Sequence, residues 1–193
     1  MNTTIGLIIT GFGSAVAVIA FFLPWLRADF INTALPIIEM IIGFFNQQLK
    51  KIVQQLHGVS SLTAYTAVFD LGFLSTEFRL VMLLPLIMAT IAILGIIITL
   101  ATQGRAGRVM NAIVAIAGAI VAGLLVLNIT NLSRLGFGGD WPVGAAIAFL
   151  GFSPSTGFWL SLGGVLLIVV GAVIAAVAST LASNRQVNNP PYV

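Results

Sequence analysis

Four long runs without a charged side chain are the feature that most constrains how this chain can fold. They cover residues 5–26, 80–102, 109–128 and 157–182, and none contains Asp, Glu, Lys, Arg or His. A helix of about 20 apolar residues crosses a bilayer core of about 30 Å, and backbone groups in lipid must be satisfied internally. The sequence therefore predicts four transmembrane helices, with Pro85 kinking the second or ending its first turn.

Composition argues against a soluble domain. The 193 residues are 59% hydrophobic and 7% charged, whereas soluble domains carry about 25% charged residues. The net charge of +3 is too small and too scattered for a nucleic-acid surface. We expect an all-α membrane protein, a single four-helix bundle over residues 1–193. Its first run is expected to be a retained helix, because it exceeds a typical signal core and lacks a basic start.

The distribution of charge predicts the orientation. Four spans leave both ends on one side, and no acidic residue lies there. Three arginines lie on that side: Arg105 and Arg108 in the short loop 103–108, and Arg185 in the tail 183–193. The opposite loops, 27–79 and 129–156, balance basic with acidic residues. The positive-inside rule then places both termini in the cytoplasm and the protein in the plasma (cytoplasmic) membrane.

The two outer loops hold most of the sequence outside the spans. Residues 36–57 are expected to form an amphipathic helix, placed either in the membrane interface or against the outer loop. Its apolar face is the predicted partner-binding face: Ile38, Ile42, Phe45, Leu49, Ile52 and Leu56. Residues 62–71 are expected to be a short strand or an extended loop. Residues 143–152 are too short to span and are expected to be interfacial or re-entrant.

Two further sets of residues are assigned from their position in the spans. The tryptophans near outer span ends are expected to be membrane-interface anchors: Trp25, Trp141 and Trp159. Small residues at helical spacing are expected to pack helices within the chain, with a homodimer as the alternative. They are Ala115, Ala119 and Gly123 in the third span, and Gly164, Gly171, Ala175 and Ala178 in the fourth.

The residue types needed for chemistry are sparse. There is no cysteine, and the one histidine, His57, falls on the polar side of the expected outer helix. A zinc site needs three or four ligands, and no serine, histidine and acid can be combined into a triad. No catalytic, cofactor-binding or metal-binding residue is predicted. The chain is not expected to be an enzyme, and no small-molecule substrate or nucleic-acid partner is expected.

The layout resembles the claudin-like four-helix membrane proteins. The local matches are the segment LPWLRADFI at 23–31, the Gly-Phe-Trp at 157–159, the glycine pair at 163–164 and the final Tyr192-Val193. The resemblance implies a long first outer loop, a short basic inner loop and cytoplasmic ends. The cysteine pair of that family is absent, so tight-junction function does not carry over. The chain is also similar to uncharacterised bacterial four-span proteins.

These features predict a non-enzymatic membrane protein that acts by protein–protein interaction. It would be an accessory subunit, an assembly factor or an adhesion-like component, in contact with the lipid bilayer and with other membrane proteins or itself. One alternative is an oligomeric pore or transport subunit with Asn111 on its path. Another is a lipid-active enzyme at the outer interface using Asp70, Glu77 or His57.

Overall fold

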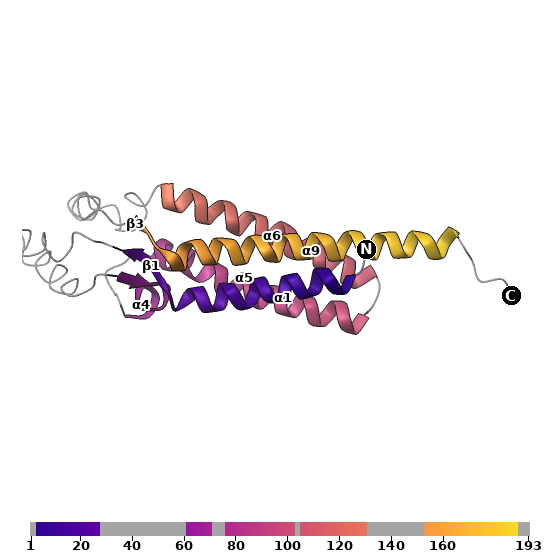
Figure 1. The fold of residues 1–193 in the computed structure, drawn as a ribbon, viewed down its shortest axis with the longest axis horizontal. Helices are drawn as coiled ribbons and strands as arrows, with labels where there is room; N and C mark the ends of the chain where they lie inside the picture. The colour runs from indigo at the N-terminus through magenta and orange to yellow at the C-terminus, as the bar shows by residue number, and fades with distance from the viewer. Residues whose placement is uncertain (1–2, 28–60, 71–75, 103–104, 131–152, 189–193) are drawn as a thin grey trace, which may run out of the picture. The chain divides into compact units, whose positions relative to one another are not determined.

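Four long helices make up most of the computed structural model (Figure 1), which describes residues 3–27, 61–70, 76–102, 105–130 and 153–188. The long helices are α1 (Thr3–Phe21), α5 (Thr76–Thr102), α6 (Arg105–Thr130) and α9 (Thr156–Asn188). Each contains a segment long and apolar enough to cross a membrane. The prediction of four such helices is confirmed.

The first helix ends earlier than the apolar run that predicted it. α1 stops at Phe21, and the chain is extended from Pro24 to Arg27. Proline has no N–H to donate to a helix, and the residue before it, Leu23, is disfavoured in helical geometry. The apolar run 5–26 therefore contains both a helix and the beginning of a strand.

Two helices extend beyond the spans predicted for them. α6 begins at Arg105 and so includes Arg108, both of which were expected in a loop. α9 continues through Arg185, which was expected in a tail. Arginine and alanine are favourable helix residues, so a helix can continue past the apolar run. In α5, Pro85 lies in the helix interior, not in its first turn.

A small antiparallel sheet accompanies the helices, where the sequence predicted at most a short strand in the first outer loop. Its strands are β1 (Pro24–Arg27), β2 (Ser61–Thr63) and β3 (Ser153–Pro154), in the order β2-β1-β3. The sequence predicts the end of a span where most of β1 lies, and a loop where β3 lies. These short strands pair across long separations in the chain, so no local hydrophobic periodicity predicts them.

The segment expected as one strand divides into a strand and a helix. After β2, residues Ala64–Phe69 form the short helix α4. The cause is a capping box at Thr63: its hydroxyl accepts from the Thr66 N–H at 3.0 Å, and the Thr66 hydroxyl accepts from the Thr63 N–H at 3.2 Å. Residues 64–69 are therefore helical, neither strand nor extended loop.

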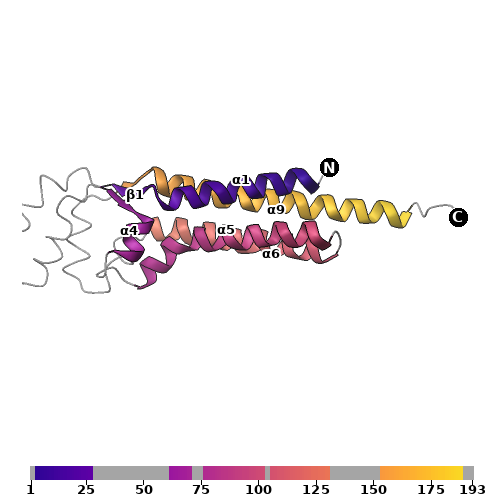
Figure 2. The same cartoon turned by 90° about the horizontal axis from the view of Figure 1, so that it is seen from below.

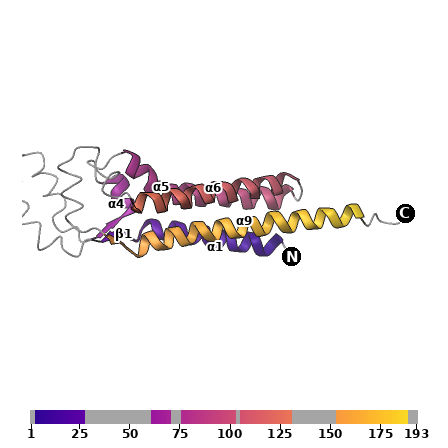
Figure 3. The ribbon, with the colours of Figure 1, turned by 90° about the horizontal axis from the view of Figure 1, so that it is seen from above.

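The chain divides into two compact units. The first comprises Met1–Ile19, Leu84–Leu124 and Leu160–Val193, and the second comprises Ala20–Leu83 and Leu125–Trp159. In the first unit α1 lies beside α9, and α5 lies beside α6 (Figures 2 and 3). The second unit contains the sheet and α4. The amphipathic helix predicted at 36–57, the run 143–152 and Trp141 lie outside the described residues.

Candidate functional site

The three short strands bring both predicted outer loops to one place. Arg27 at the end of β1 pairs with Ser61, the first residue of β2, and with Ser153, the first residue of β3. The described residues on either side of 28–60 are therefore neighbours. Ser153, which follows 131–152 in the sequence, lies beside Arg27. We call β1, β2 and β3 together the strand platform (Figure 1).

Trp25 is the buried centre of the strand platform. Its side chain is 2% exposed, and its indole N–H donates to the Ala20 carbonyl oxygen at 2.8 Å. Its ring meets the Phe158 ring nearly edge-on, with centroids 6.0 Å apart. A headgroup anchor presents its polar edge to the interface, whereas this indole is buried and already paired. Trp25 therefore has a packing role in the second unit, and its position at a membrane interface stays a prediction.

Gly157 allows the start of α9 to approach β1. A Cβ atom at this position would lie 2.7 Å from the carbonyl oxygens of Leu23 and Pro24 and 2.7 Å from the Trp25 ring. The Ser155 N–H also donates to the Trp25 carbonyl at 2.8 Å. The Leu-Pro-Trp and Gly-Phe-Trp segments, noted separately in the sequence, are thus in direct contact.

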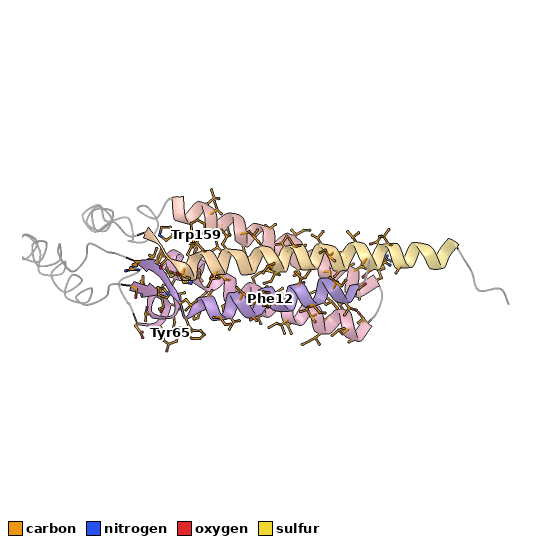
Figure 4. The ribbon with its side chains drawn as sticks, in the orientation of Figure 1. Phe12, Tyr65 and Trp159 are labelled. Carbon is orange, nitrogen blue, oxygen red and sulfur yellow. The ribbon has the colours of Figure 1, made fainter. Side chains whose placement is uncertain are left out.

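An aromatic cluster that sequence reasoning missed lies in the same unit. Tyr65 stacks on Phe22 with centroids 5.9 Å apart, and it lies 5.2 Å from Phe69. Phe21, which is 2% exposed, meets Tyr65 edge-on. Figure 4 labels Tyr65 together with Trp159, whose side chain is exposed. The available signal was the spacing of four between Tyr65 and Phe69, but it appears only once α4 is recognised as helical.

In the first unit, α1 and α9 make backbone contact through glycines. A Cβ at Gly171 would lie 2.5 Å from the Thr10 nitrogen, and one at Gly6 would lie 2.5 Å from the Ala175 nitrogen. A Cβ at Gly164 would lie 2.9 Å from the Gly13 carbonyl oxygen and from the Ala17 nitrogen. The predicted small residues of the fourth span lie buried on α9: Gly164, Gly171, Ala175 and Ala178. Such close approach is how helices gain packing energy in lipid.

The small residues predicted on the third span do not pack in this way. Ala119 and Gly123 are exposed, and a Cβ at Gly123 would meet nothing within 4 Å. Ala115 is half-buried. The buried face of α6 instead includes Gly118, where a Cβ would lie 2.7 Å from Val169. The expected intramolecular contact of this stripe is therefore corrected.

A buried polar contact joins α5 and α6. The Thr99 hydroxyl donates to the Gly95 carbonyl at 2.8 Å and lies 3.4 Å from the Asn111 amide oxygen. A hydroxyl has one proton to donate, and the shorter distance shows that Thr99 donates it to the Gly95 carbonyl. The Asn111 Nδ2 is buried without a hydrogen-bond partner among the described residues. These contacts account for Asn111, 2% exposed, as part of helix packing.

The titratable candidates give no assembled centre in the part of the chain described. Among those residues, no group of three or more His, Cys, Asp or Glu could hold a metal ion. Asp70 is exposed at the end of α4, and Arg105 is exposed while Arg108 is half-buried. His57 lies outside the described residues. Comparisons with protein-family models, with curated proteins and with solved structures found no match.

Proposed function

We propose that this chain is a multi-pass integral membrane protein without enzymatic activity, which acts by binding another membrane protein or a second copy of itself. The observation that carries the proposal is the strand platform. It holds Arg27, Ser61 and Ser153 side by side, the described residues that flank 28–60 and follow 131–152. Loops anchored on a rigid scaffold are the usual place for binding residues.

Membrane insertion is supported by which side chains face outward. Only 33–44% of each most apolar window is buried within the protein. Large apolar side chains such as Ile8, Phe12 and Ile116 are exposed, while Thr10 and Asn111 are buried. Extended exposed apolar surface on a folded chain marks contact with another apolar phase. Four spans covered by lipid explain this arrangement.

The orientation that we propose places both termini in the cytoplasm, because Arg105, Arg108 and Arg185 lie on that side. The absence of cysteine makes the test direct. A cysteine at the exposed position Ser61 is expected to react with a membrane-impermeant maleimide applied to intact cells. A cysteine at the exposed position Ala106 is expected to react only after permeabilisation. The reverse pattern would contradict the orientation.

The binding role is expected to depend on the apolar face of residues 36–57. In mild detergent the wild-type protein should run as an assembly larger than a monomer. Phe45→Glu with Leu49→Glu should release the monomer, because two charges would enter an apolar contact. Gln47→Glu with Gln54→Glu adds the same charge on the polar face and should leave the assembly intact.

Size-exclusion chromatography with light scattering and native mass spectrometry would measure these masses. A wild-type chain that runs only as a lone monomer would remove the basis of the proposal. Assemblies that survive both double substitutions would place the contact elsewhere.

A further inference from the structure

The second unit carries an exposed aromatic surface that the strand platform does not use. We call Phe22, Tyr65 and Phe69 the aromatic patch; their side chains are 59%, 44% and 64% exposed. Their rings are in direct succession, with Phe22 against Tyr65 and Tyr65 against Phe69. A contiguous apolar patch on a folded chain marks an interaction surface.

The patch is held outward by the packing beneath it. Ala64 and Ala67 on the opposite side of α4 are 0% exposed. The helix start is fixed by the capping box at Thr63, which also ends a strand paired with β1. Phe21 is buried and contacts both Phe22 and Tyr65 edge-on. The exposed rings therefore cannot turn inward without displacing side chains that are already packed.

The sequence pattern of α1 indicates what covers the patch. Its exposed apolar residues recur at helical spacing: Ile5, Ile8, Phe12 and Ile19. If α1 crosses the bilayer, as the proposed function holds, this is its lipid-facing side, and the exposed Phe22 directly follows the end of the helix. No charged residue occurs within α4, and the exposed Asp70 follows it directly.

We infer that the aromatic patch lies in the boundary between headgroups and acyl chains of the outer leaflet, and that α4 is an interfacial helix. A tyrosine suits this depth because its ring is apolar and its hydroxyl remains near water. The patch thus has an anchoring role like that expected of Trp25. This inference rests on the proposed membrane insertion, and its occupant is a lipid surface.

Site-directed spin labelling of the full chain in phosphatidylcholine liposomes tests the inference. The chain has no cysteine, so Phe69→Cys, Asp70→Cys, Phe12→Cys and Ser61→Cys each carry a single nitroxide. Collision rates with oxygen, which concentrates in lipid, and with a water-soluble nickel chelate report depth. We expect the oxygen-to-nickel ratio at 69 to lie between those at 12 and 61. It should exceed the ratio at 70 several-fold.

Each other outcome identifies a different failure. A label at 69 that meets nickel as readily as the label at 61 places the patch in water and overturns the inference. Shielding from both reagents at 69 means that protein covers the patch, which also overturns it. A lipid signal at 12 with a water signal at 69 leaves the proposed insertion intact. Water signals at both 12 and 69 contradict the insertion itself.

Discussion

Gly171→Leu is expected to disrupt the packing of α1 on α9 and cause the largest loss of stability among single substitutions in the first unit. Even a Cβ atom would lie 2.5 Å from the Thr10 nitrogen and hydroxyl and 2.6 Å from the Gly6 carbonyl. Backbone atoms of a packed helix cannot yield as a flexible side chain does. Overpacking typically costs about 1–3 kcal/mol and occasionally more, and leucine adds three further carbons.

Gly163→Leu provides the matched control on the same helix. A Cβ at Gly163 meets nothing within 4 Å, and leucine improves helix propensity by about 1 kcal/mol over glycine. Thermal unfolding in detergent, followed by circular dichroism, should show a lower Tm for Gly171→Leu and an unchanged or higher Tm for Gly163→Leu. Equal Tm values for both variants would show that α1 and α9 are not in backbone contact.

Trp25→Ala is expected to cost about 3–5 kcal/mol, the range for truncating a buried large aromatic side chain. The substitution removes a ring that is 2% exposed, together with its contact to Phe158 and its bond to the Ala20 carbonyl. Trp25→Phe keeps much of the volume and loses the N–H, so it should cost less. The Tm measurement used for the glycine variants separates the contribution of the ring volume from that of the N–H hydrogen bond.

Trp159→Ala is the corresponding control, because that ring is 57% exposed and its truncation should change the Tm little. If the strand platform holds the binding loops, Trp25→Ala should also weaken the assembly seen in mild detergent. Trp159→Ala should not. Equal effects of the two substitutions on Tm would contradict the buried role of Trp25.

The aromatic patch and the strand platform could not be predicted from the sequence, for physical reasons that differ. Tyr65 and Phe69 share a helix face only because Thr63 and Thr66 cap a short helix. These side-chain hydrogen bonds to the backbone favour the helix over the strand that the composition suggests. Likewise, Trp25 resembles a membrane anchor in the sequence because it follows an apolar run. Its burial depends on Phe158 and Gly157, which lie far along the chain.

The sequence by itself determined the four long apolar helices, because an uncharged run of about 20 residues is a local property and needs no partner to be recognised. It also placed small residues at helical spacing on the fourth span. Only the tertiary structure decided which small residues pack, since Gly171 meets Thr10 while Gly123 meets nothing. The same holds for the strand platform: pairing of Arg27 with Ser61 and Ser153 is a long-range event, and no local pattern encodes it.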